Sequence, residues 1–178
     1  MRAFIAIPLP EEIRTILFNI QKELSGFAKI NWVPKKNIHL SLKFLGEVQE
    51  QQIQEITALL TIIKFKKFKA TLSSIGAFPN LNHINTIWVS AIPQEPVIKL
   101  QQQIDQLLLS KFPQDQRFSV HITIGRVKFI KQKEELIKKI KELQIPKEEF
   151  EIDKFELIKS TLTGQSPIYE VIKDFPAS

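Results

Sequence analysis

Hydrophobic positions recur along this chain with two different periods. Apolar residues at every second position predict strands, whereas apolar residues three or four positions apart predict helices. The first pattern predicts eight strands, at residues 2–8, 27–33, 38–46, 67–76, 84–92, 120–126, 150–161 and 167–174. The second predicts four helices, at residues 9–26, 49–63, 95–113 and 131–143. Interspersed strands and helices with short hairpin connections favour an α+β fold over a doubly wound parallel sheet.

Two of the predicted strands carry the same short pattern. Residues 38–44 read IHLSLKF, and residues 120–126 read VHITIGR. In each copy a histidine and a hydroxyl residue are two positions apart in an apolar run, so strand alternation places both on one face. Each half of the chain also carries a long helix. We therefore expect two related lobes, each supplying half of a site in a central groove.

The repeated residues suit acid-base chemistry. His39 with Ser41, and His121 with Thr123, would bring two imidazoles and two hydroxyls together across a cleft. Burying polar side chains costs free energy unless they find a partner or serve a function. A single histidine with its hydroxyl could be a packing feature, but two copies indicate a functional site. Two imidazoles and two hydroxyls form a constellation for general acid-base chemistry on an oxyanion such as a phosphodiester.

Two cations lie beside these motifs. Lys43 continues the alternation of His39 and Ser41, so we expect it either to hold phosphate or to be a solvated lysine at a strand end. Arg126 has the opposite parity from His121 and Thr123, so it reaches the groove only if Gly125 bends or bulges the strand.

Other site chemistries fit the sequence less well. A metal site would be short of ligands, because the chain has no cysteine, no HExxH motif and no acidic residue at ligand spacing. The sequence around Ser41 lacks the Gly-x-Ser-x-Gly nucleophile elbow of a serine hydrolase. Two residues apart on one strand, Ser41 should also lie about 6–7 Å from His39, too far for direct activation. The five glycines are isolated, which argues against a nucleotide-cradling loop.

The composition indicates what kind of partner the protein binds and in which compartment it works. The 178 residues include 43% hydrophobic residues, no cysteine and a formal net charge of +6. We expect a chain with a real core, a polyanionic partner, a reducing cytosol and no membrane span. The basic run at residues 64–69 is more typical of a solvated strand face than of a nucleic-acid contact. We expect His83 at the surface, and Trp32 and Trp88 in the core or the groove wall.

With these residues in view, the chain resembles the two-histidine (2H) phosphoesterase superfamily and, within it, the RNA 2′,3′-cyclic phosphodiesterases, also called 2′-5′ RNA ligase-like proteins. The resemblance spans nearly the whole chain. It includes residues 2–7, 32–34 with 39–47, 78–80 with 87–88, 117–127, and 169–176. Ser41 stands where threonine is usual, which keeps the hydroxyl, and Val120 stands where proline is common.

The resemblance implies one domain over residues 1–178, built from two intertwined, pseudo-symmetric lobes, each an antiparallel sheet with helices on its outer face. It implies hydrolysis of an RNA 2′,3′-cyclic phosphate to a 2′-phosphomonoester, and in vitro 2′-5′ joining of tRNA halves. His39 would be the acid and His121 the base, while Ser41, Thr123, Arg126 and Lys43 would bind phosphate. It also implies no metal or other cofactor, a monomer and a cytoplasmic location.

Two other functions stay open from the residues. A non-catalytic RNA-binding module would use the same groove to grip a phosphorylated RNA end. A cyclic phosphodiesterase acting on small nucleotides would use the same chemistry on another substrate. Replacing either histidine by glutamine or asparagine separates binding from catalysis, because only an enzyme needs the proton transfer.

Overall fold

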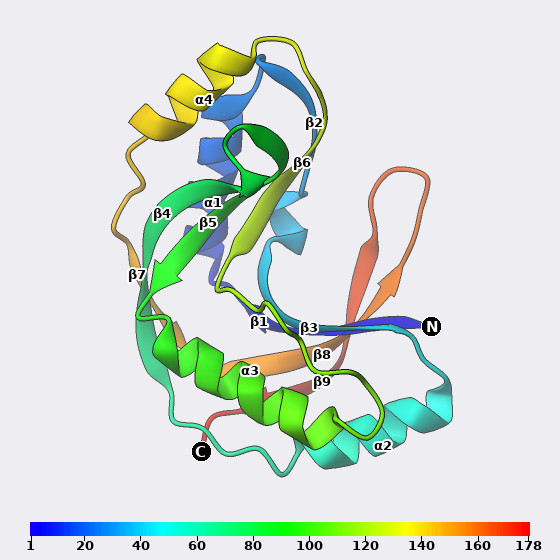
Figure 1. Cartoon of the computed structure of the whole chain (residues 1–178). Coiled ribbons are helices and arrows are strands. Elements are labelled where there is room, and N and C mark those ends of the chain that lie inside the picture. Colours follow the sequence, from blue (N-terminus) through cyan, green and yellow to red (C-terminus); the bar gives the residue numbers. More distant parts are fainter.

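Two antiparallel sheets form the frame of the computed structural model, which describes residues 1–178 (Figure 1). The strands are β1 Arg2–Pro8, β2 Ala28–Trp32, β3 His39–Glu47, β4 Phe68–Asn80, β5 His83–Ile92, β6 Ile122–Ile130, β7 Glu149–Ile152, β8 Lys154–Thr161 and β9 Ile168–Pro176. The helices are α1 Glu11–Leu24, α2 Glu50–Leu60, α3 Glu95–Leu108 and α4 Lys133–Glu142, with a short 3-10 turn at Lys35–Asn37.

The chain passes between the two sheets several times, and β4 to β7 all lie in one of them. The four-stranded sheet has the order β3-β1-β8-β9, and the five-stranded sheet has the order β2-β6-β5-β4-β7. Helices α2 and α3 lie with the four-stranded sheet, whereas α1 and α4 pack on the five-stranded sheet (Figure 1). The predicted α+β fold of two antiparallel sheets with four helices is confirmed. Each sheet takes strands from both halves of the chain, so neither half builds a lobe alone.

Helix α1 shows how the sequence forms these elements. Its residues Ile13, Leu17 and Leu24 are buried at helical spacing. Glu11 and Glu12 lie in the first turn, where carboxylates interact favourably with the positive end of the helix dipole. Gly26 follows the helix at φ 99°, a backbone conformation that glycine adopts without steric cost. The apolar face therefore fixes what the helix packs against, and the glycine lets the chain turn into β2.

Two strand predictions need correction. The strand predicted at residues 67–76 continues to Asn80, and only two residues form the turn to β5. The strand predicted at residues 150–161 is two strands separated by Asp153: β7 pairs with β4 in one sheet, and β8 pairs with β1 in the other. Both strands have buried apolar residues, so alternation cannot tell to which sheet each one belongs. None of the helices has the length and hydropathy needed to cross a membrane.

Candidate active site

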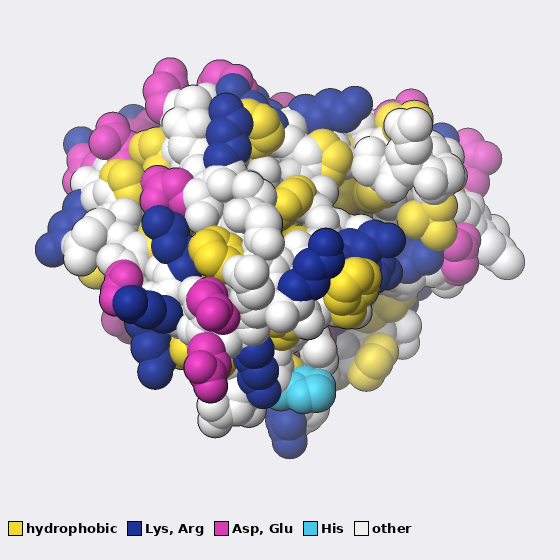
Figure 2. Space-filling view, turned by 90° about the horizontal axis from the view of Figure 1, so that it is seen from above, with side chains coloured by type: hydrophobic (Ala, Val, Ile, Leu, Met, Phe, Trp, Pro, Cys, Tyr) yellow, Lys and Arg dark blue, Asp and Glu magenta, His cyan; other side chains and the backbone are white.

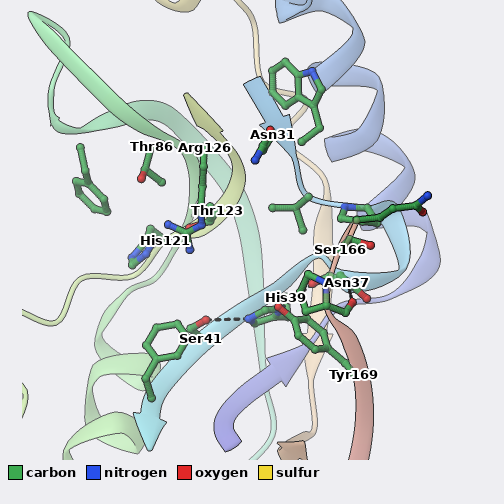
Figure 3. A pocket seen from close by; sticks show the side chains of 17 residues that line it. Asn31, Asn37, His39, Ser41, Thr86, His121, Thr123, Arg126, Ser166 and Tyr169 are labelled. Carbon is green, nitrogen blue, oxygen red and sulfur yellow. Dashed lines mark hydrogen bonds between the residues drawn. The ribbon is translucent and has the colours of Figure 1, made fainter. Parts of the chain in front are cut away.

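A cleft of about 380 Å³ lies between the two sheets. Both repeated motifs contribute to it, together with β2, the turn after β2, β4, β5 and the β8–β9 hairpin. Figure 3 shows His39 and Ser41 on one wall, and His121, Thr123 and Arg126 on the other. The lining residues are Asn31, Trp32, Val33, Pro34, Asn37, His39, Ser41, Phe44, Phe78, Thr86, His121, Thr123, Arg126, Gln165, Ser166, Pro167 and Tyr169.

His39 is held on both sides of its ring. Its Nδ1 lies 2.6 Å from the Asn37 carbonyl oxygen, and its Nε2 lies 2.8 Å from Ser41 Oγ (Figure 3). Because a carbonyl only accepts, Nδ1 carries the proton, and in the neutral ring Nε2 accepts a hydrogen bond from the Ser41 hydroxyl. The rings of Phe4 and Tyr169 lie 4.9 Å and 5.6 Å away, centroid to centroid. The expectation that Ser41 lies too far from His39 for direct contact is wrong, because the two side chains lean together.

His121 is held in a corresponding way. Its Nδ1 lies 2.9 Å from the carbonyl oxygen of Ser119, which again makes Nδ1 the donor and leaves Nε2 for other partners. The ring of Phe78 meets it edge-on at 4.9 Å. His121 directly precedes β6, whereas His39 is the first residue of β3. In both motifs the imidazole is oriented by the carbonyl of the residue two positions earlier.

The cleft favours the neutral form of both imidazoles. Burial lowers the pKa of His39 below its usual 6.5, and the positive charges of Arg126 and His121 lower it further, against the opposing hydrogen bond to Asn37. Burial and Arg126 also lower the pKa of His121, against the hydrogen bond to Ser119. Burial raises the pKa of Tyr169. A bound anion that neutralises Arg126 would allow either imidazole to take up a proton more readily.

Each motif strand contains an extra residue directly after its hydroxyl residue. In β3, Ser41 pairs with Ala6 and Lys43 with Ile5, so Leu42 has no partner on β1. In β6, Thr123 pairs with Trp88 and Gly125 with Ile87, so Ile124 has no partner on β5. Such a bulge shifts the alternation by one residue.

The bulges decide which side chains reach the cleft. Arg126 lines it, which meets the condition that the strand bulges beside Gly125. Phe44 lines it for the same reason, although alternation assigned that face to Lys43. Lys43 is instead buried at 3% exposure and paired with Asp105. Both expectations for Lys43, a phosphate ligand in the groove and a solvated lysine, are therefore wrong.

The charged lining of the cleft is positive only. No aspartate or glutamate is among the lining residues, and the Arg126 guanidinium makes no hydrogen bond or ion pair with the protein. A guanidinium without a protein carboxylate is suited to bind a phosphate. The wider surface is mixed: on the face in Figure 2, basic side chains stand among acidic ones. The structure contains no group of three His, Cys, Asp or Glu side chains that could hold a metal ion.

Several lining residues carried no functional prediction. Asn31 and Thr86 pair with Arg126 across neighbouring strands, and Tyr169 reaches the site from β9. Nothing in their local sequence marks them, because strand register brings them to the cleft. Of the two tryptophans, Trp32 lines the cleft, whereas Trp88 packs on Gly76 and Phe78. His83 is exposed at the start of β5, as predicted.

Comparisons with known proteins agree on one family. A family model described as LigT like Phosphoesterase matches this chain twice, over residues 7–88 and 89–169. A protein of Methanocaldococcus jannaschii named RNA 2′,3′-cyclic phosphodiesterase is 39% identical, over 98% of this chain and 100% of its own. A Thermotoga maritima protein of the same name is 36% identical, over 97% of this chain and 93% of its own. A crystal structure of a Thermus thermophilus protein superposes with a TM-score of 0.81 at 28% identity, covering 99% of this chain and 97% of that one.

Proposed function

Because the chain belongs to the LigT-like phosphoesterase family of enzymes, we propose that it hydrolyses the 2′,3′-cyclic phosphodiester at an RNA end to a 2′-phosphomonoester. The relatives named for this activity support the proposal over nearly their whole length. The observation that carries it is the placement of two half-buried imidazoles on opposite walls of a cleft that contains a free guanidinium and no carboxylate.

The proposed reaction uses one proton transfer on each side of phosphorus. His121 Nε2 takes a proton from water as the water oxygen attacks phosphorus, and the bond from phosphorus to the ribose 3′-oxygen breaks. Protonated His39 gives its Nε2 proton to that 3′-oxygen, which leaves as a hydroxyl. The fixed Nδ1 hydrogen bonds to Asn37 and Ser119 support these roles, because in both residues they turn Nε2 into the cleft with no backbone partner, where it contacts only the Ser41 hydroxyl in His39.

The remaining polar side chains would stabilise the phosphoryl charge. Ser41 and Thr123 would donate hydrogen bonds to the non-bridging oxygens, and Arg126 would contribute its positive charge. Once His39 is protonated it no longer accepts from Ser41, so the hydroxyl is free to turn to the substrate. The exposed ring of Phe44 at the cleft would stack on a base next to the reacting end.

The proposal includes the finer features implied by the resemblance. In vitro 2′-5′ joining of tRNA halves would use the same two proton transfers in the same direction, with a 5′-hydroxyl in the place that water takes in hydrolysis: His121 takes the hydroxyl proton, and the bond from phosphorus to the ribose 3′-oxygen breaks as His39 protonates that oxygen. We also propose that the chain acts as a monomer, as one domain, in the cytoplasm and without a metal cofactor.

The test is turnover of an oligoribonucleotide that ends in a 2′,3′-cyclic phosphate, with and without a chelator. We expect a 2′-phosphate product that contains one oxygen from ¹⁸O-labelled water. His39→Gln and His121→Gln should each lower kcat by about 10²- to 10⁴-fold and keep the wild-type unfolding midpoint within a few degrees. Tight binding of the same oligonucleotide without turnover by the wild type would favour a binding module instead.

A further inference from the structure

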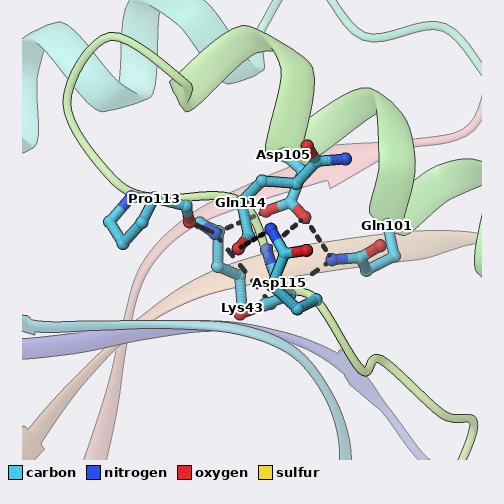
Figure 4. A network of polar contacts seen from close by, with 7 residues as sticks. Lys43, Gln101, Asp105, Pro113, Gln114 and Asp115 are labelled. Atoms are coloured by element: carbon cyan, nitrogen blue, oxygen red, sulfur yellow. Dashed lines mark hydrogen bonds and ion pairs between the residues drawn. The ribbon is translucent and has the colours of Figure 1, made fainter.

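Lys43 begins a buried polar network that joins the two halves of the site (Figure 4). Its ammonium group pairs with Asp105 of α3 and donates a hydrogen bond of 2.9 Å to the carbonyl oxygen of Pro113. Asp105 also accepts hydrogen bonds of 2.9 Å from the backbone N–H of Asp115 and from Gln101. Three separate segments therefore meet at this network: β3, helix α3 and the loop that follows α3.

The ion pair at the centre of this network is deeply buried. The side chains of Lys43 and Asp105 are 2% and 3% exposed. Although burial alone raises the pKa of Asp105, the hydrogen bonds from Lys43, Asp115 and Gln101 lower it below its usual value. A buried ion pair of this kind contributes little net stability compared with apolar side chains of the same size, so stability alone does not account for it.

The loop that the network holds leads directly to His121. Pro113 and Asp115 are fixed against Lys43 and Asp105, and six residues later the chain reaches the imidazole. At the far end of the same segment, Ser90 Oγ donates a hydrogen bond of 2.7 Å to the carbonyl oxygen of Val120. One anchor thus ties the segment to the strand of His39, and the other ties it to the five-stranded sheet.

The two motifs differ at the position that Lys43 occupies in the first and Gly125 in the second. Lys43 and Gly125 both come two residues after the motif hydroxyl and directly after the unpaired bulge residue. Gly125 lies so close to Ile30 and Trp32 that it has no room for a Cβ, whereas Lys43 extends a long side chain to α3 and the loop. The bridging contact therefore exists only in the first motif. Its strand, β3, is the one that lies against the segment leading to His121.

We propose that Lys43 is a positioning residue, which through Asp105 fixes the segment at residues 113–121 and so sets His121 against His39 and Ser41. It does not contact the substrate. Arg126 and Thr123 are placed by β6 within the five-stranded sheet, so they do not depend on this network. Loosening the segment should therefore impair catalysis more than substrate binding.

A double variant separates this role from a purely structural one. Lys43→Met leaves the Asp105 carboxylate buried without its partner and should lower the unfolding midpoint. Lys43→Met combined with Asp105→Leu replaces both charges by apolar groups and should recover much of that midpoint, although it removes both the hydrogen bond of Lys43 to Pro113 and that of Asp105 to Asp115. We expect the double variant to show a kcat about 10- to 100-fold below wild type, with KM within about threefold.

Hydrogen exchange supplies a readout that does not need activity. Backbone amides at residues 113–121 should exchange faster in the double variant than in the wild type. The matched control is Lys154→Met, which breaks a partly exposed ion pair with Glu156 and Asp174 in the same sheet, away from this loop. It should change neither kcat nor exchange at residues 113–121.

Gln101→Met provides a second variant if the double variant does not fold. It removes only the hydrogen bonds that the Gln101 amide donates to Asp105 and Asp115, leaves the Lys43–Asp105 pair in place, and should give a smaller change in the same direction. Wild-type kcat and wild-type exchange in a folded double variant, or in Gln101→Met, would overturn the proposal. The kinetic readout rests on the proposed function. If the wild type hydrolyses no cyclic phosphate, that function fails, and the exchange measurement still tests the positioning role.

Discussion

Phe44 and Arg126 occupy corresponding places in the two motif strands. Each comes three residues after the motif hydroxyl, and each lines the cleft because an unpaired residue shifts the strand alternation by one. The repeated motif thus supplies an imidazole and a hydroxyl from each wall. In addition, one wall supplies the phenyl ring of Phe44 and the other supplies the guanidinium of Arg126. This difference suits a ligand with a base on one side and a phosphate on the other.

Phe44 should contribute to binding of an oligonucleotide rather than to chemistry. It is 67% exposed at the cleft, and stacking of a base on an aromatic ring is worth about 1–3 kcal/mol. We expect Phe44→Ala to raise KM for a cyclic-phosphate oligonucleotide by about 5- to 150-fold. Phe44→Tyr should retain wild-type KM.

The matched control for Phe44 is another exposed phenylalanine. Phe129 is 52% exposed on β6 and does not line the cleft. Phe129→Ala should leave KM unchanged. Equal KM values for Phe44→Ala and Phe129→Ala would show that Phe44 does not stack on the substrate.

The pH dependence of kcat/KM should be a bell centred on the acidic side of neutrality. The active form needs one neutral and one protonated imidazole, and the pKa values of both His39 and His121 lie below 6.5. We therefore expect the maximum of kcat/KM below pH 6.5. Arg126→Gln removes a positive charge that lowers both pKa values, so both limbs of the bell should move to higher pH.

Arg117→Gln is the control for this shift, because Arg117 does not contribute to either lowered pKa. Its profile should keep the wild-type limbs. A profile for Arg126→Gln with limbs at the wild-type pH values would contradict the electrostatic coupling.

Ser41→Ala should impair the chemical step. It removes the hydroxyl that hydrogen-bonds His39 and that would stabilise the phosphoryl oxygens. Loss of one such donor costs about 10²- to 10³-fold in kcat. Ser41→Thr keeps the hydroxyl and should keep most of the activity, and Thr123→Val and Thr123→Ser form the corresponding pair on the other wall.

The close contact of Ser41 with His39 also makes attack by the serine a distinct mechanism to test. Acid quench during turnover of ³²P-labelled substrate should leave no label on the protein. Stable label at Ser41 would indicate a covalent intermediate and would replace the direct attack by water.

Gly125→Ala should destabilise the protein. A Cβ at this position would lie 2.7 Å from Ile30 Cγ2 and from Trp32 Cε3, so the neighbours or the strand must shift. Overpacking of this kind costs about 1–3 kcal/mol. Gly164→Ala has open space around the added methyl group and should change the free energy of unfolding, measured in urea, by no more than about 0.5 kcal/mol. Equal effects of the two substitutions would contradict the packing at Gly125.

The sequence by itself predicted the α+β class, the four helices and most strand positions, because each depends on local periodicity. It also singled out His39 and His121, because an imidazole next to a hydroxyl inside two apolar strands is a local pattern. Only the tertiary structure decided which sheet each strand joins, because β7 and β8 both carry buried apolar residues that either sheet could cover. The bulges after Ser41 and Thr123 likewise arise from pairing with neighbouring strands. That pairing brings Arg126 and Phe44 to the cleft and buries Lys43 against Asp105.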